Sequence, residues 1–143
     1  MTTRIYDPNR VSIILGGIPM QGFADGDFLE ITYVSDQFME VAGTDGEVSR
    51  SKSNDNRATV TVRLMQTSKT NALLSALVNT DLNADGGAGV GAFLVADLSG
   101  NTLLQSENAW IKKIPDQSFG RESQERAWTI MCDELRSFVG GNV

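Results

Sequence analysis

The sequence contains no histidine, one cysteine and three prolines among its 143 residues. Without histidine, the chain cannot build a Ser-His-Asp or Cys-His catalytic system or a zinc site with histidine ligands. A single cysteine excludes an internal disulfide and a multi-cysteine metal cluster within one chain. Basic residues are also scarce, with 12 Lys and Arg against 18 Asp and Glu, so the net charge is −6. Because DNA binding relies on cationic contacts to phosphates, this balance disfavours a protein that grips DNA.

Long hydrophobic runs are absent as well. The longest, such as Ile13–Leu15 and Ala92–Ala96, are far too short to cross a bilayer. The first eight residues lack the apolar segment of a signal peptide. We therefore expect a protein that is made and used in a cytoplasm, or released from one without a Sec route.

The patterns that are present predict a mainly β protein, with residues 1–143 as one domain. Apolar and polar residues alternate with period two in several segments bounded by Gly, Asp or Asn, which is typical of strands. The predicted strands are 11–15, Leu29–Tyr33, Ala58–Met65, Ala92–Leu98, Thr102–Ile114 and Ala127–Leu135. In the last of them the apolar phase slips near Asp133 and Glu134, which predicts a β-bulge.

One segment follows a helical period instead. Between Lys69 and Thr80, four apolar residues (73, 74, 77 and 78) form a single stripe, and Thr67 or Ser68 precedes the segment as a candidate N-cap. The sequence lacks a βαβ rhythm. The predicted fold is therefore two packed antiparallel sheets, a β-sandwich or barrel, with one flanking helix at 69–80.

The polar stretch 35–56 is predicted to be a long projecting hairpin. Two β-prone pieces, Phe38–Ala42 and Glu47–Ser51, flank a turn at Gly43–Gly46. An isolated two-stranded extension is only marginally stable, so we expect it to become ordered against another subunit. A mobile surface loop is the alternative. The candidate subunit-interface residues are Phe38, Met39, Val41, Val48 and Arg50.

Two short motifs suggest ligands but lack the context that each requires. Asp81–Gly86 matches the start of a calcium-binding EF-hand loop, yet the twelfth position, which should be a bidentate Glu, is Ala92. Gly87–Ala92 fits a dinucleotide-binding glycine pattern, but it follows a helix and precedes a strand, the reverse of the functional order. A polar, flexible connection explains both segments.

Clusters of charged residues also fail to define a catalytic or nucleic-acid site. Carboxylates gather at 25–30, 122–125 and 133–134, but no spacing singles out an acid–base pair. Trp110–Lys113 combines an aromatic ring with two cations, which is a pattern that can bind nucleic acid, although a core or interface tryptophan beside solvated lysines explains it more simply. Cys132 fits a buried apolar position. We therefore predict no catalytic site, no cofactor and no metal.

Several segments together resemble one protein family across nearly the whole chain. Their order and spacing are more specific than any one of them. They are Tyr6-Asp7-Pro8, Gly22–Gly26, Gly43–Val48, Lys52–Asp55, Thr61–Ser68, Asp97–Gly100, Ala109–Ile111, Pro115-Asp116, Phe119-Gly120 and Phe138–Gly141. In these features the chain resembles the tail tube proteins of contractile-tailed bacteriophages, in the branch seen in Pseudomonas-type myophages. Type VI secretion tube proteins look like distant relatives.

The resemblance implies a virion protein that assembles with itself in the host cytoplasm. Six subunits would form a ring whose strands join into one inner barrel, and rings would stack into a hollow tube. Implied partners are a contractile tail sheath protein, a baseplate or tube initiator and a tape measure protein in the lumen, while DNA passes through unbound. Six copies at −6 would carry a formal charge of −36 per ring, and an acidic lumen would repel DNA phosphates.

Two alternatives to a phage tail tube stay open at this point. One is a tube subunit of a related injection machine, a tailocin or a type VI secretion system. The other is a monomeric β-sandwich module that binds carbohydrate or calcium, although aromatic residues make up only 7% of the chain.

Overall fold

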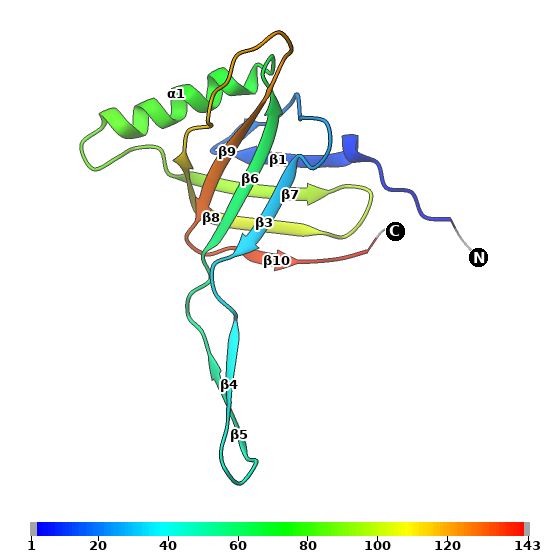
Figure 1. Cartoon of the computed structure of the whole chain (residues 1–143), viewed down its shortest axis with the longest axis vertical. Coiled ribbons are helices and arrows are strands. Elements are labelled where there is room, and N and C mark those ends of the chain that lie inside the picture. The colour runs from blue at the N-terminus through cyan, green and yellow to red at the C-terminus, as the bar shows by residue number, and fades with distance from the viewer. Residues whose placement is uncertain (1–2, 142–143) are drawn as a thin grey trace.

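The computed structural model describes residues 3–141 and is built from ten strands, one α-helix and one short 3-10 helix within that range. Figure 1 shows a two-layered body with a long hairpin extending from one end. The elements in chain order are η1 (Pro8–Arg10), β1 (Val11–Leu15), β2 (Ile18–Pro19), β3 (Leu29–Tyr33), β4 (Phe38–Ala42), β5 (Val48–Lys52), β6 (Ala58–Met65), α1 (Thr70–Asn83), β7 (Gly91–Asp97), β8 (Leu103–Lys113), β9 (Glu125–Cys132) and β10 (Arg136–Phe138). The predicted mainly β fold with antiparallel sheets and one flanking helix is confirmed.

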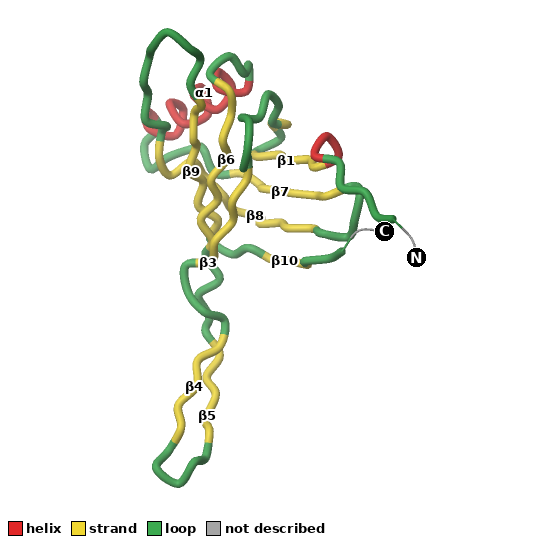
Figure 2. The backbone as a smooth tube through the Cα atoms, turned by 45° about the vertical axis from the view of Figure 1, so that its right-hand side comes forward, coloured by secondary structure: helices red, strands yellow, loops and turns green. Residues whose placement is uncertain are grey.

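The body is one eight-stranded antiparallel sheet that bends into two layers. Its order is β2-β1-β7-β8-β9-β6-β3, with β10 added to β8, while β4 and β5 form a separate two-stranded sheet. Strand β8 belongs to both layers, because its first half pairs with β7 and β10 and its end, from Ala109 to Lys113, pairs with β9. Figure 2 shows β3, β6 and β9 crossing steeply over the other strands.

The core lies between these layers. Alternate residues of β6 and β9 point inward, where Val60, Val62 and Ile130 are fully buried, and Phe93 and Ile13 meet them from the opposite layer. This burial of one face per strand is the reason that the period-two pattern exists. Helix α1 contributes Leu74 and Val78 to the same core.

The helix and the last strand differ from their predicted form. Helix α1 runs from Thr70 to Asn83, three residues beyond its predicted end. The N-cap position is Lys69, which makes no side-chain cap, although the Ser68 hydroxyl accepts a hydrogen bond from the Thr70 N–H. The predicted bulge near 133–134 is wrong: the chain bends there, and the apolar phase changes because β10 begins a new pairing with β8.

The glycine-rich run 86–91 allows close approach of backbones. Asp81 Oδ1 accepts hydrogen bonds from the N–H groups of Ala88 and Gly89, and a Cβ on Gly89 would lie 2.6 Å from the Asp81 Cβ. A Cβ on Gly91 would lie 2.8 Å from the Gly16 Cα, a backbone atom that cannot rotate aside. The glycines therefore allow the connection between α1 and β7 to pack closely against Asp81 and the turn at Gly16.

Replacing Gly91 with alanine is expected to destabilise the fold by about 1–3 kcal/mol, because the new methyl group must displace the turn at Gly16. The matched control is Gly120→Ala, where the nearest atom is 4.0 Å from the added Cβ. Urea unfolding of both variants measures the difference. Equal midpoints for the two variants would show that the Gly16 turn moves freely.

Candidate assembly surfaces

The hairpin arm, defined here as β4, β5 and their connecting turn (residues 38–52), is the most exposed part of the structure. All ten residues of its two strands are exposed, and within residues 3–141 these strands pair only with each other. Val41 retains 70% of its accessible surface. A two-stranded ribbon that leaves large apolar side chains in water has the character of a contact surface rather than of a core element.

The register of the arm divides the five predicted interface residues between two faces. Phe38 lies opposite Lys52, and Val48 lies opposite Ala42, so Phe38, Val48 and Arg50 share one face. The Arg50 guanidinium stacks on the Phe38 ring, 4.4 Å from its centroid. Met39 and Val41 lie on the opposite face with two serines. The sequence pattern located the two strands, but it did not show that the five candidate interface residues lie on two different faces.

The root of the arm is held by a small polar cluster. Asp55 accepts hydrogen bonds from Arg57 Nε at 2.8 Å and Nη2 at 2.9 Å, and from Ser35 Oγ at 2.9 Å. The Arg57 hydrogen bonds, followed by that of Ser35, hold the pKa of the Asp55 carboxyl well below its usual range. The carboxylate thereby ties the strand leaving the body to the strand that returns to it.

Acidification is expected to loosen this root. Because the folded pKa of Asp55 is depressed, its contribution is complete above the ordinary aspartate pKa of 3.8, weakens progressively as the pH falls below that value, and is lost as the pH falls through the depressed folded pKa. NMR order parameters of the arm should therefore begin to decline below about pH 4 and continue to fall as the pH is lowered further. In Asp55→Asn they should be low at pH 7 and show no further step. An arm equally rigid in both proteins would contradict this role for the carboxylate.

A second surface is the four-strand layer, defined here as β3, β6, β9 and residues 109–113 of β8. The Arg63 N–H donates a hydrogen bond to Phe28 O, and the Val34 N–H donates one to Arg57 O. In an antiparallel pair, the N–H and C=O groups of successive residues point alternately towards and away from the partner strand. The N–H and C=O groups of residues 29, 31 and 33 on β3 therefore point away from β6. At the other edge, β8 pairs with β7 only as far as Ala109. Both edges of this layer therefore carry unpaired backbone groups within the described chain.

The two edges differ in charge. One cross-strand row runs from Glu30 through Thr61 and Thr129 to Lys113, so it ends in an acid on β3 and in a base on β8. Glu30 is exposed and lies 3.1 Å from the partly buried Arg63, and Lys113 lies 3.5 Å from Asp116 in an exposed ion pair. Such surface pairs are weak and leave these side chains free to exchange partners.

The outward side of this layer, called the hydroxyl face below, carries hydroxyl groups together with charged side chains of both signs. It carries one threonine on β3 and β9 and two on β6. They are Thr32, Thr59, Thr61 and Thr129. Arg63 lies on the same face between two acids, because its guanidinium is 3.1 Å from Glu30 and 3.9 Å from Glu125.

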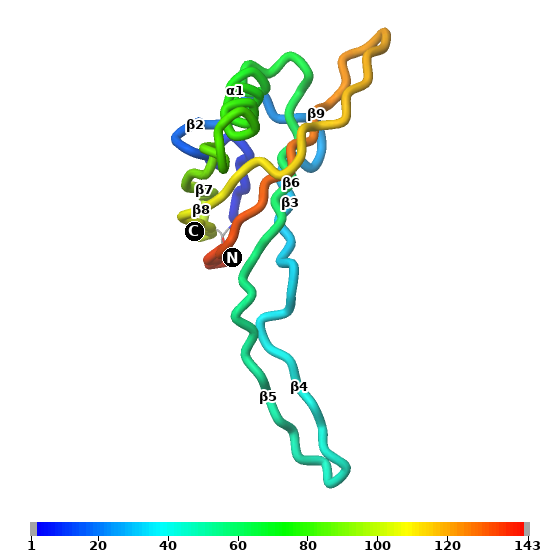
Figure 3. The backbone as a smooth tube through the Cα atoms, turned by 90° about the vertical axis from the view of Figure 1, so that its left-hand side faces the viewer, coloured from blue at the N-terminus to red at the C-terminus, as the bar shows by residue number. Residues whose placement is uncertain are grey.

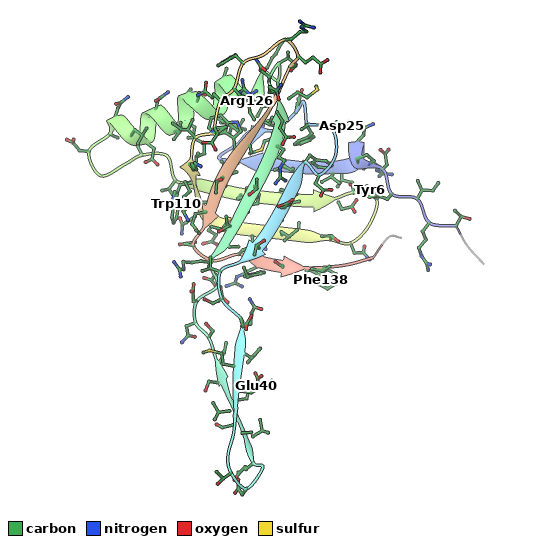
Figure 4. All side chains as sticks on the ribbon, viewed as in Figure 1. Tyr6, Asp25, Glu40, Trp110, Arg126 and Phe138 are labelled. Carbon is green, nitrogen blue, oxygen red and sulfur yellow. The ribbon has the colours of Figure 1, made fainter. Side chains whose placement is uncertain are left out.

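A third surface is the Arg126 cleft, named for a residue that lies at the end of the body opposite the arm (Figure 4). It has a volume of about 290 Å³ and lies between α1, the end of β9 and the connection 114–124. Its wall residues are Gln66, Asn71, Ser75, Ile114, Pro115, Gln117, Phe119, Arg126 and Trp128. Arg126 was missed at the sequence level, although it continues the inward phase of Trp128 and Ile130 and so could have been found.

The family model of the bacteriophage PhiTE tail tube protein matches residues 17–140, which is most of the chain and includes all three surfaces. The chain belongs to this tail tube family. A relative, "Structural protein ORF10" of Pseudomonas phage KPP10, is 32% identical over 146 residues, which cover 98% of this chain and 84% of that protein. As a phage structural tail protein, the chain is assigned to the virion tail.

Two solved structures share the fold of this tail tube family member. One is the tube-terminating cap of the anti-feeding prophage, and it covers 96% of this chain and 93% of its own at a TM-score of 0.64. The other is the sheath/tube terminator of the extracellular contractile injection system PVC in its extended state, with 97% and 100% coverage at a TM-score of 0.64. Each is 13% identical, so these matches show the fold alone.

The structure also places the motifs that suggested ligands. Asp81, Leu82 and Asn83 lie inside α1, so the segment cannot wrap an ion as an EF-hand loop does. Among residues 3–141, no three His, Cys, Asp or Glu side chains are grouped to hold a metal. Cys132 is buried as predicted, and burial raises the pKa of its thiol to about 11. Over the same range, no helix has the length and apolarity needed to span a membrane.

Proposed function

We propose that the chain is the structural subunit of a phage tail tube, a non-catalytic protein whose residues 1–143 form a single tail-tube domain. Six copies form a ring, and rings stack into a hollow tube that a contractile sheath surrounds and that conducts DNA into the host. The observation that carries this proposal is the four-strand layer, whose two edges are both unpaired and oppositely charged. Family membership supports the tail tube role.

The geometry of this layer suits closure into a ring. Each neighbouring pair in the order β3-β6-β9-β8 is antiparallel, so β3 and β8 run in opposite directions. Rotation about a ring axis keeps strand direction, and β3 of one copy therefore meets β8 of the next as an antiparallel neighbour. Pairing of this kind is heterologous and satisfies every edge once the ring closes.

Closure also determines which side of the layer faces the channel. The inner side is covered by β1, β7 and α1, and these elements would fill the channel if they faced it (Figure 3). The hydroxyl face therefore lines the lumen in this proposal. On this face the cations Arg63 and Lys113 each lie beside an acid, which reduces their attraction for DNA phosphates, and the excess of acids over bases in the chain adds repulsion.

The remaining surfaces are available to other tail components. In this proposal the partners are further copies of the chain, a tail sheath protein, a baseplate or tube initiator, and a tape measure protein in the lumen. Assembly takes place in the host cytoplasm. The hairpin arm, with Phe38, Met39, Val41, Val48 and Arg50, makes contacts between copies.

Negative-stain electron microscopy of the purified protein over a concentration series, with light scattering alongside, tests the proposal. Rings or hollow tubes with six-fold end views are expected. A protein that stays monomeric, including in the presence of its baseplate initiator, would overturn the tube role. A monomer that binds calcium or a glycan would favour a ligand-binding module instead.

A second candidate is a ring that ends a tube, because the two similar solved structures are a cap and a terminator. Copy number separates the candidates. A tube subunit is present in many rings per tail, whereas a terminator forms one. Quantitative gel analysis of purified virions against a known single-ring protein gives the ratio. The tube subunit of a tailocin or a secretion system would also form hollow tubes in the electron microscope. The presence of a capsid with packaged DNA distinguishes a phage from those two machines.

A further inference from the structure

Arg126 carries a buried charge that no acid in the described chain balances. Its side chain is only 7% exposed, and its Nη1 and Nη2 atoms donate to the carbonyl oxygens of Glu125 and Ser118. The Phe119 ring lies 5.1 Å from its guanidinium carbon. No carboxylate of residues 3–141 is within ion-pair distance of it. A guanidinium has five N–H donors, so donors remain for a further acceptor.

The surroundings of Arg126 form a built site rather than a surface groove. Trp128 closes one wall and is fixed by a 2.9 Å hydrogen bond from its Nε1 to Asn71 Oδ1. Ile114 and Phe119 provide apolar walls, and Phe119 is 76% exposed at the rim. Because the cation at the base of the cleft is buried, a charge-assisted hydrogen bond to an incoming carboxylate is stronger there than at an exposed surface.

The tip of the hairpin arm supplies a carboxylate of the right kind. Residues 43–47 contain two acids, Asp45 and Glu47, and no base. Asp45 Oδ1 is already engaged, because it accepts the Glu47 N–H at 3.0 Å. The Glu47 carboxylate has no partner within the described residues and is exposed at the far end of the arm.

The tip and the cleft lie at opposite ends of the long axis of the molecule. Figure 4 labels Arg126 at one end and Glu40, on the arm, towards the other. One copy therefore cannot join its own tip to its own cleft. We propose that the Arg126 cleft of one copy binds Glu47 of the hairpin arm of a second copy, head to tail along this axis.

This contact rests on the proposed tube function and gives it a stacking mechanism. The edges of β3 and β8 join copies around a ring, whereas a head-to-tail contact that uses two different surfaces repeats without closing and builds a filament. The two contacts involve different residues. Stacking can therefore fail while rings still form.

The first test uses Glu47→Gln, with Asp36→Asn as a control that removes the same charge at the root of the arm. Both positions are exposed, so folding is unaffected. Glu47→Gln should form rings but need at least about tenfold more protein to form tubes, because it leaves Arg126 buried and unpaired. The control should stack as the unmodified chain does. Equal stacking by all three proteins would overturn the inference.

The second test works even if tubes do not form. A Glu47→Cys variant is mixed with a Phe119→Cys variant under mild oxidation, and Cys132 stays silent because it is buried. Mixed disulfide dimers are expected to exceed those from an Asp36→Cys control by about tenfold or more. Failure of the unmodified chain to form rings counts against the tube role, whereas failure to trap this dimer counts against the Glu47 contact. An Asp36→Cys control that forms mixed dimers in equal yield would also contradict the Glu47 contact.

Discussion

Reversing the charge at either end of the row from Glu30 to Lys113 is expected to weaken ring closure. In Glu30→Lys or Lys113→Glu, like charges meet at every joint between β3 and β8, at a cost of about 1–3 kcal/mol per joint. The protein concentration needed for assembly should rise by about tenfold or more. The double variant restores opposite charges and should assemble at nearly the original concentration.

Sedimentation velocity of the four proteins measures this rescue. The folded monomer should be little affected, since the side chains of Glu30 and Lys113 are exposed and such surface ion pairs are weak. Asp116→Asn is the control for the pair that Lys113 makes in its own copy. Two single variants that assemble normally, or a double variant that is worse than both, would place these edges outside the joint.

Introducing a charge into the hairpin arm should leave the protein folded but unable to assemble. In Phe38→Asp the aromatic ring that stacks on Arg50 is lost, but both side chains are exposed, so the body remains folded. If the arm buries this ring against a neighbouring copy, the variant must bury an unpaired carboxylate there. Truncation of a central aromatic contact costs about 2–4 kcal/mol, and we expect a monomer that does not polymerise.

Val41→Asp is the matched variant on the opposite face of the arm. Circular dichroism and electron microscopy of the two variants show whether one face or both are buried on assembly. Loss of assembly in one variant alone identifies the docking face. Normal tubes from both would remove the arm strands from the essential contacts.

The sequence was most informative where one strand face is buried. Strands β3 and β6 begin and end as predicted, because their inward residues, such as Val60 and Val62, alternate strictly with polar ones. The hairpin arm was located by its central turn and its β-prone flanks, and β5 was misplaced by a single residue. These features are local, so a short segment contains the whole pattern.

Features that depend on distant segments were not accessible in the same way. The three-residue β10 has no core face of its own and exists through pairing with β8, about thirty residues away. The unpaired edges of the four-strand layer follow from strand order, which the alternation does not encode. The end of helix α1 at Asn83 was also missed, and there Asp81 accepts hydrogen bonds from the glycine-rich connection that follows.

A helical reconstruction of the assembled tube by electron cryomicroscopy would show whether the four-strand layer forms the wall of the channel. We expect a continuous antiparallel sheet in which β3 of one copy pairs with residues 110–113 of β8 in the next, with the hydroxyl face towards the channel. A ring in which either edge stays open to solvent, or in which β1 and β7 line the channel, would contradict it.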